Sequence, residues 1–145
     1  GKIHQANEGC ACTMNSILKQ FIKHLTVGEN EVVLLDMEAG VEHFGRGVDN
    51  SVDLILMIVD PSFESLKLTK KIQQLGDSIG KTVFFVLNKV NELVLPTMLE
   101  SIDDQSKVLA VISTDTEIAR KGLVGDELMM EIPEIHTLAR KILKQ

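Results

Sequence analysis

Aromatic side chains are scarce in this sequence of 145 residues, which has five Phe, no Trp and no Tyr. A core built without them must be packed from the aliphatic side chains of Ile, Leu, Val and Met. Gly and Pro are also few, at 10 and 3 residues, whereas hydrophobic residues make up 44% of the chain. This composition is typical of a globular domain and excludes a long disordered tail. The length predicts one domain with a sizeable core.

The sequence also lacks clustered basic residues, long apolar runs and a secretory leader. Its formal net charge is −6, from 15 basic and 21 acidic side chains. Because nucleic acids are bound through clustered Lys and Arg, we expect no nucleic-acid partner. A membrane span needs about 18 consecutive apolar residues, and no run approaches that length. We therefore expect a cytoplasmic protein with no membrane partner.

Four short apolar runs predict strands that are buried on both faces. They are continuous rather than alternating, as in the strands of a parallel sheet, and lie at residues 31–36, 53–60, 82–88 and 107–112. Helical patterns separate them. Strands that alternate with helices predict an α/β fold with a doubly wound, mainly parallel sheet, formed by residues 1–145 as a single domain.

The helices are predicted from apolar spacing and from end signals. An amphipathic pattern covers residues 13–25, and an apolar stripe runs from Leu68 to Ile79 before Gly80. Pro96 can occupy the first position of a short third helix.

Two further helices are predicted towards the end of the chain. Thr114 and Glu117 have the spacing of a capping box, before a short helix that Gly122 would end. Pro133 and Glu134 suit the start of the last helix, whose final turns are basic and so complement the helix dipole.

Polar residues follow the predicted strands, where ligands of open parallel sheets bind. Asp36 ends the first strand and Gly40 follows it. In P-loop NTPases an acid so placed serves the Mg²⁺ shell and a nearby glycine N–H meets the γ-phosphate; the alternative is an aspartate that only caps a turn.

Asn88, before Lys89, could recognise the edge of a base because an amide both donates and accepts. Its alternative is an ordinary turn asparagine.

Cys10 and Cys12 are separated by one residue just before the first predicted helix. A disulfide across such short spacing is strained, so reduced thiols or a bound metal are expected. Two thiolates supply half of a tetrahedral metal site, and a second copy of the chain could supply the rest. The alternative is a pair of small buried thiols.

Residues 36–47 read D-M-E-A-G-V-E-H-F-G-R-G, with Glu42, His43 and Arg46 as a polar cluster that could contact a metal or a partner, or simply be solvated. This run resembles the D-x-x-A-G-[LV]-E-H-x-G-R-G sequence of CooC-type proteins, the nickel-insertion ATPases of carbon monoxide dehydrogenase maturation in the MinD-like group. The C-x-C pair and Asn88-Lys89 are similar to that family's metal and adenine segments, and the likeness extends over nearly the whole chain.

The resemblance implies a P-loop NTPase-like fold of the SIMIBI and MinD type, in a homodimer that encloses ATP and Mg²⁺. It implies that Asp36 serves the Mg²⁺ and water shell, Gly40 the γ-phosphate and Asn88 the adenine. Cys10 and Cys12 would bind Ni²⁺ or Zn²⁺. The partner implied is the carbon monoxide dehydrogenase apoenzyme.

The sequence departs from this family because it contains no G-K-G-G-x-G-K-T loop. We interpret it as a C-terminal portion of such a domain, incomplete at its N-terminus. Since the loop provides most of the phosphate contacts, we expect no ATPase activity from this chain. In related folds the missing first strand lies inside the sheet, so its loss predicts either shifted strands or self-association at the exposed edges.

Two other functions are compatible with these residues. One is a non-enzymatic metal-binding dimer that uses only the two cysteines. The other is a MinD- or ParA-like positioning ATPase, which would require a membrane-binding amphipathic tail that the short last helix does not supply.

Overall fold

The computed structural model describes residues 20–29, 31–37, 41 and 52–144. The chain divides into two compact units, Gly1–Asp53 and Leu54–Gln145, and each is described by itself. Most of the first unit lies outside the described residues. The single domain that we predicted therefore stays a prediction.

The second unit is built on a parallel sheet of three strands in the order β1-β2-β3. The strands are β1 (Leu54–Val59), β2 (Thr82–Val90) and β3 (Val108–Ser113). These are three of the four apolar runs, with β2 two residues longer than the sequence indicated. The predicted α/β class with a parallel sheet is confirmed for this unit.

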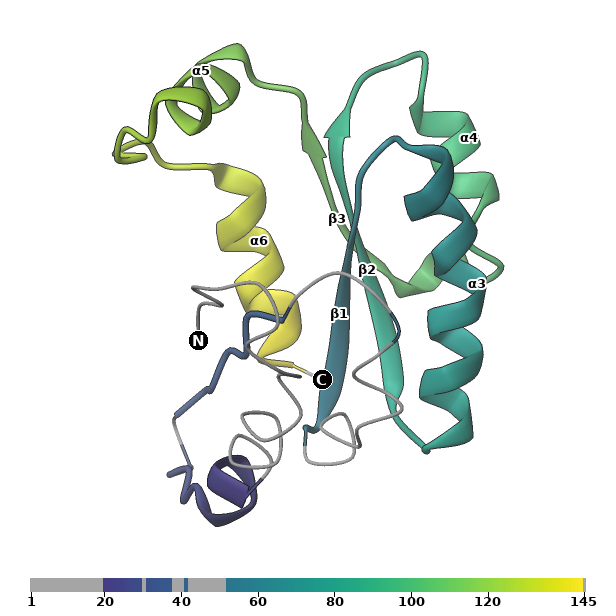
Figure 1. The fold of residues 1–145 in the computed structure, drawn as a ribbon, viewed down its shortest axis with the longest axis vertical. Helices are drawn as coiled ribbons and strands as arrows, with labels where there is room; N and C mark the ends of the chain where they lie inside the picture. Colours follow the sequence, from purple (N-terminus) through teal and green to yellow (C-terminus); the bar gives the residue numbers. More distant parts are fainter. Residues whose placement is uncertain (1–19, 30, 38–40, 42–51, 145) are drawn as a thin grey trace, which may run out of the picture. The chain divides into compact units, whose positions relative to one another are not determined.

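Helices lie on both sides of this sheet (Figure 1). The helices α3 (Phe63–Ser78) and α4 (Leu95–Glu100) lie on one side, and α6 (Pro133–Ile142) lies on the other. A short 3₁₀ turn, η2 (Gln105–Lys107), precedes β3, and α5 (Thr116–Val124) follows it. None of the described helices has both the length and the apolar character that a membrane crossing needs.

The central strand β2 carries the core because it has a neighbour on each side. Val83, Phe85, Val86 and Leu87 are all fully buried. Side chains alternate between the two faces of a strand. Val83 therefore meets Gly76 of α3 on one face, while Val86 packs with Leu138 of α6 on the other.

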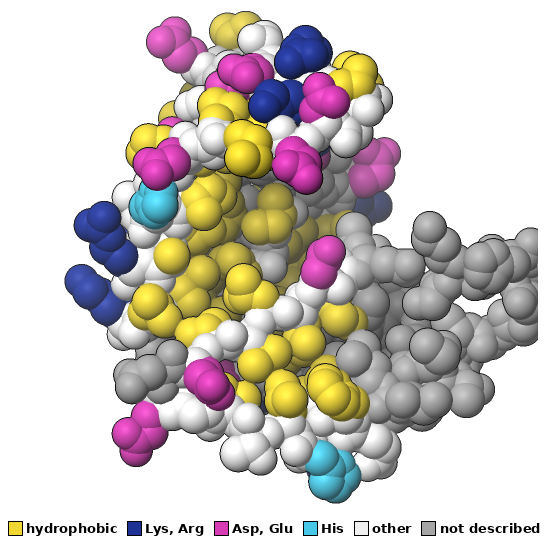
Figure 2. Space-filling view, turned by 90° about the vertical axis from the view of Figure 1, so that its left-hand side faces the viewer, with side chains coloured by type: hydrophobic (Ala, Val, Ile, Leu, Met, Phe, Trp, Pro, Cys, Tyr) yellow, Lys and Arg dark blue, Asp and Glu magenta, His cyan; other side chains and the backbone are white. Residues whose placement is uncertain are grey.

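The face of the sheet that carries α6 is only partly covered. Leu138 and Ile142 of α6 pack on the cluster around Val86 and Leu109. Ile58 of β1, by contrast, is 53% exposed. Figure 2 views this side of the molecule and shows apolar side chains gathered in a hollow. The helix α6 therefore covers β3 and part of β2, and leaves β1 more open.

The helix ends agree with the sequence signals in three places. Ser62 accepts a hydrogen bond from the Ser65 N–H at the start of α3, and Gly80 follows that helix with a φ of +68°. Proline occupies the first turn of both α4 and α6. These ends are set locally, which is why the sequence predicts them.

The ends of α5 correct two predictions. The N-cap is Asp115 and not Thr114: its carboxylate accepts from the N–H groups of Glu117 and Ile118 at 2.7 and 3.0 Å. The helix continues through Gly122 to Val124, and Gly125 ends it with a φ of +74°. The Asp115 carboxylate accepts from two N–H groups at once, and Gly125, unlike Gly122, has the left-handed conformation that commonly ends a helix.

Residues 31–37 carry no regular secondary structure, so the strand predicted at 31–36 is wrong. Val32, Val33 and Leu34 are 57%, 46% and 82% exposed. A strand gains its stability from ladder hydrogen bonds and cross-strand contacts, and this run has no strand partner among the described residues. Residues 20–24 are helical, in agreement with the end of the helix predicted at 13–25.

Candidate functional site

The carboxyl ends of β1 and β2 bring three polar side chains together. Asp60 directly follows β1, and Asn88 and Lys89 lie near the end of β2. The two strands are parallel neighbours in a register that pairs Val59 with Leu87. Residues 60 and 88 are therefore the next pair along the same edge of the sheet, which is where open α/β sheets bind ligands.

Asp60 is the acceptor that joins these three residues. Its Oδ1 accepts a hydrogen bond from Nδ2 of Asn88 at 2.9 Å, and its Oδ2 accepts from Nζ of Lys89 at 2.5 Å. The side chain of Asp60 is 39% exposed and that of Lys89 63% exposed. Because an ion pair this open to water contributes only about 0–1 kcal/mol, its effect is to orient the groups rather than to hold the fold.

The backbone at Lys89 is irregular in a way that places these side chains. The register of β2 on β3 shifts between Leu87 and Val90, so one extra residue of β2 is accommodated there. Lys89 has a φ of +56°, a left-handed conformation that is uncommon for residues other than glycine. Pairing resumes beyond this point, where the Thr114 N–H donates to the Val90 carbonyl at 2.8 Å. The irregularity is therefore a local β-bulge, a device that re-aims side chains at the ends of strands.

The end of β3 adds a different kind of group to the same edge. Asp115 uses its carboxylate to cap α5, so among the described residues that oxygen is engaged in holding the helix. At the end of β3 the polar side chain therefore stabilises a helix, whereas at the ends of β1 and β2 the polar side chains bond to one another. We call Asp60, Asn88 and Lys89 the strand-end cluster.

The other predicted site residues are distributed between described and undescribed parts of the chain. Asp36 is exposed, in the irregular segment of the first unit. Gly40, Cys10 and Cys12 lie outside the described residues, as do Glu42, His43 and Arg46. Within the described ranges, no three His, Cys, Asp or Glu side chains gather as metal ligands would. Of the predicted nucleotide residues, only Asn88 is placed in a defined cluster.

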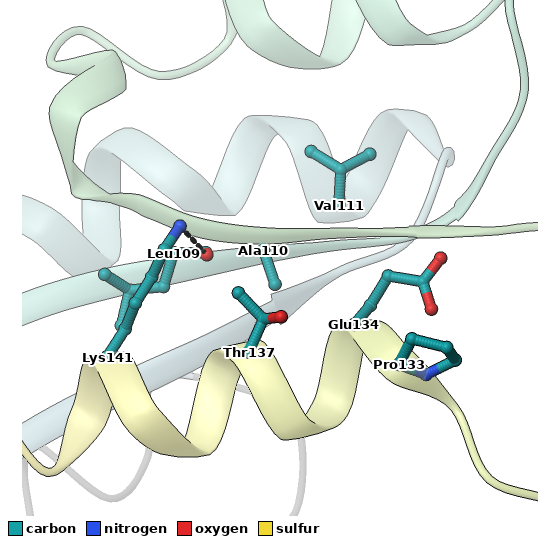
Figure 3. Close-up of a pocket in the computed structure, with 7 residues that line it drawn as sticks. All are labelled: Leu109, Ala110, Val111, Pro133, Glu134, Thr137 and Lys141. Carbon is teal, nitrogen blue, oxygen red and sulfur yellow. Dashed lines mark hydrogen bonds between the residues drawn. The ribbon is translucent and has the colours of Figure 1, made fainter.

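A groove of about 390 Å³ lies elsewhere, between β3 and α6 (Figure 3). Seven residues line it: Leu109, Ala110, Val111, Pro133, Glu134, Thr137 and Lys141. Nζ of Lys141 donates to the Leu109 carbonyl across it. None of the residues of the strand-end cluster contributes to this groove, and its lining is mostly apolar, so we assign it no ligand.

Asp60 is the residue whose role the sequence did not reveal. It was one of several acids that follow apolar runs, and nothing in its immediate sequence separated it from Asp36 or Asp115. The parallel pairing of β1 with β2 supplies the missing information, because it brings Asn88 and Lys89 opposite Asp60. A signal existed because Asp60 and Asn88 each stand at the end of an apolar run, but it required knowing that these two runs are neighbours.

Comparison with known proteins finds relatives that are named as ATP-binding proteins. The chain is 45% identical, over 99% of its length, to an uncharacterized ATP-binding protein of Methanocaldococcus jannaschii, of which it covers 57%. It is 32% identical, over 90% of its length, to a second such protein of that organism, of which it covers 52%. It is also 34% identical over 86% of its length to the carbon monoxide dehydrogenase accessory protein CooC of Rhodospirillum rubrum, of which it covers 48%.

No family model matches the chain. The chain spans about half the length of the curated relatives it matches. The similarity to CooC agrees with the resemblance stated from residues 36–47. By sequence, this chain is similar to ATP-binding proteins, CooC among them.

Proposed function

We propose that this chain is part of a CooC-type, ATP-dependent metallochaperone that delivers nickel to carbon monoxide dehydrogenase in the cytoplasm. The observation that carries the proposal is the strand-end cluster, in which Asn88, the residue expected to meet adenine, is held at a ligand-binding edge of a parallel sheet. The 34% identity to CooC supports the choice of this family over other ATPases.

Asn88 has the chemistry that adenine recognition requires. Its amide has one acceptor oxygen and two N–H donors, and Asp60 uses one donor. The remaining acceptor and donor match the exocyclic amine of adenine and an adjacent ring nitrogen. Since the side chain is half-buried and not fully enclosed, a base can reach it.

The phosphate contacts are proposed from the resemblance to CooC-type proteins alone. We propose that Asp36 serves the Mg²⁺ and water shell and that the N–H of Gly40 meets the γ-phosphate. The printed sequence has no G-K-G-G-x-G-K-T loop. Since that loop supplies the lysine and most N–H contacts to phosphate, this chain on its own binds nucleotide weakly and does not hydrolyse ATP.

The cargo end of the site is assigned to Cys10 and Cys12. We propose that the two thiolates bind Ni²⁺ or Zn²⁺ together with the same pair from a second copy of the chain. A homodimer would then hold one metal ion and pass it to the apoenzyme.

The nucleotide part is tested by NMR on the ¹⁵N-labelled chain. We expect ATP to shift the side-chain amide signals of Asn88 and the backbone signal of Lys89, and phosphate release to stay at the level of an Asp36→Ala variant. In an Asn88→Leu variant, which keeps the volume and removes the amide, the Lys89 shift should be lost. Unchanged Asn88 signals at millimolar ATP would contradict the assignment.

The metal part is tested separately by native mass spectrometry with Ni²⁺ or Zn²⁺. We expect one metal ion for two chains, and loss of both metal and dimer in Cys12→Ser. Metal binding that survives this substitution, or that occurs at one ion per monomer, would contradict the shared site.

A further inference from the structure

We propose that Asp60 is a positioning residue that makes the strand-end cluster select a 6-amino purine over a 6-oxo purine. This inference rests on the proposed function and specifies how that site tells one base from another. Asp60 need not touch the base. It acts by fixing the direction in which Asn88 and Lys89 present their polar atoms.

The orientation of the Asn88 amide follows from its contact with Asp60. A carboxylate only accepts hydrogen bonds, so the atom of Asn88 that faces Asp60 Oδ1 at 2.9 Å must be Nδ2. The amide oxygen consequently points to the opposite side of the group. At that position the cluster offers an acceptor, which pairs with an exocyclic amine and repels a carbonyl oxygen.

Lys89 is restrained by the same carboxylate. Its ammonium group carries only donors and would suit the carbonyl oxygen of a 6-oxo purine. Nζ of Lys89 is instead held by Oδ2 of Asp60 at 2.5 Å, and the φ of +56° sets the direction from which the side chain leaves the backbone. Asp60 thus engages one N–H of Asn88 and one of Lys89, one with each oxygen, and so turns both groups towards itself.

Asp60 is itself fixed by the start of α3. Its N–H donates to Oγ of Ser65 at 3.1 Å, and its carbonyl accepts from the Ser62 N–H at 2.8 Å. The preceding residue, Val59, is fully buried in the sheet. The backbone of Asp60 therefore has a defined position before any ligand arrives, which favours preorganised recognition.

The decisive variant is Asp60→Asn, which keeps the shape of the side chain. An amide at 60 can turn either its oxygen or its nitrogen towards Asn88, and it cannot pair with the Lys89 ammonium. Asp103→Asn is the matched control, because it also breaks an exposed ion pair, with Lys70 at 3.2 Å, and leaves the strand-end cluster intact. AMP and GMP are the probes, since they differ only in the base.

Binding is followed in each variant by NMR titration of the backbone amides. We expect the parent chain and Asp103→Asn to bind AMP more tightly than GMP by about fivefold to tenfold, the value of one net hydrogen bond and one avoided repulsion. In Asp60→Asn the ratio should fall to about one. Without nucleotide, one Nδ2 proton of Asn88 should exchange slowly with water in the parent and several-fold faster in Asp60→Asn.

The possible outcomes distinguish a failure of the positioning role of Asp60 from a failure of the proposed nucleotide binding. If Asp60→Asn keeps the AMP preference of the parent, the positioning role is overturned while adenine binding at Asn88 stands. If the parent itself shows neither a preference nor shifts at Asn88, the proposed function fails and the inference fails with it. A ratio that falls equally in Asp103→Asn would assign the effect to general charge and would also overturn the positioning role.

Discussion

Two apolar runs of this chain are each followed by an aspartate, but only one of them forms a strand. Residues 54–59 form β1, where Val59 is fully buried. Residues 31–36 contain a run of four apolar residues, yet they form no strand and Leu34 is 82% exposed. The difference is the neighbour: β1 pairs along its whole length with β2, whereas residues 31–36 pair with no strand among those described.

The same dependence is visible inside the sheet. The strand β2, with two neighbours, has four fully buried apolar side chains, whereas β1, with one described neighbour, has Ile58 at 53% exposure. An apolar run therefore forms a buried strand only where neighbouring strands pair with it. The following substitutions measure how much individual contacts with neighbouring groups contribute to stability.

The largest difference is expected between Leu87→Ala and Leu34→Ala. Leu87 is fully buried in β2, so its truncation should lower the free energy of unfolding by about 2–5 kcal/mol. Leu34 is mostly exposed, and the same change there should stay within about 0.5 kcal/mol. Urea denaturation of the two variants measures both values. Equal losses would show that residues 31–36 are packed as a strand after all.

A second pair compares Gly76→Ala with Gly122→Ala. A Cβ at Gly76 would lie 2.4 Å from Cγ2 of Val83 and 3.0 Å from the Lys81 carbonyl oxygen, so α3 would have to move off β2. We expect a loss of about 1–3 kcal/mol. Gly122 has open space around it within α5, and alanine there should stabilise the chain by about 0.5–1 kcal/mol. Thermal unfolding followed by circular dichroism would refute this if both variants shifted in the same direction.

A third pair separates the two candidate caps of α5. Asp115→Ala removes the acceptor of two N–H groups and should lower the free energy of unfolding by about 1 kcal/mol. Thr114→Ala should have little effect, because the Thr114 side chain does not cap the helix. Hydrogen exchange at Glu117 and Ile118 is the local readout. Faster exchange in the Thr114 variant alone would restore the capping box predicted from the sequence.

The smallest effect concerns Asp104. Hydrogen bonds from the hydroxyl of Ser106, at 2.6 Å, and from its N–H, at 3.0 Å, hold the pKa of Asp104 below its ordinary value of 3.8. Because the folded-state pKa is the lower one, this stabilisation is complete above the unfolded pKa and is lost as the pH falls through the folded pKa.

The check on Asp104 is Ser106→Ala. We expect this variant to raise the pKa of Asp104 towards its ordinary value, and its difference in stability from the parent to disappear in acid. An NMR titration of the carboxyl carbon measures the pKa directly. The same pKa in both chains would show that Ser106 is not the cause.

Local signals predicted much of the second unit. The proline starts of α4 and α6 and the glycine after α3 follow from residues that act on their own neighbours in the sequence. The errors arose where distant partners decide. Residues 31–36 have strand composition without a described partner, and the cap of α5 depended on which of two adjacent side chains reaches the free N–H groups.

The candidate site was predictable only in part, for the same reason. Asn88 could be proposed from its place at the end of an apolar run, because that is a one-dimensional feature. The connection of Asp60 to both Asn88 and Lys89 depends on β1 and β2 being adjacent and on a bulge that gives Lys89 a positive φ. Neither feature is visible in the order of residues alone.

The contact between Lys141 and the Leu109 carbonyl is relevant to association between copies of this chain. Leu109 lies where the pairing of β3 with β2 is irregular, and β3 has no second neighbour in the described sheet. Bare carbonyls on such a strand are templates for the backbone of a foreign chain. The Lys141 ammonium already occupies the Leu109 carbonyl, so this group is not available to the backbone of an added strand unless that contact breaks.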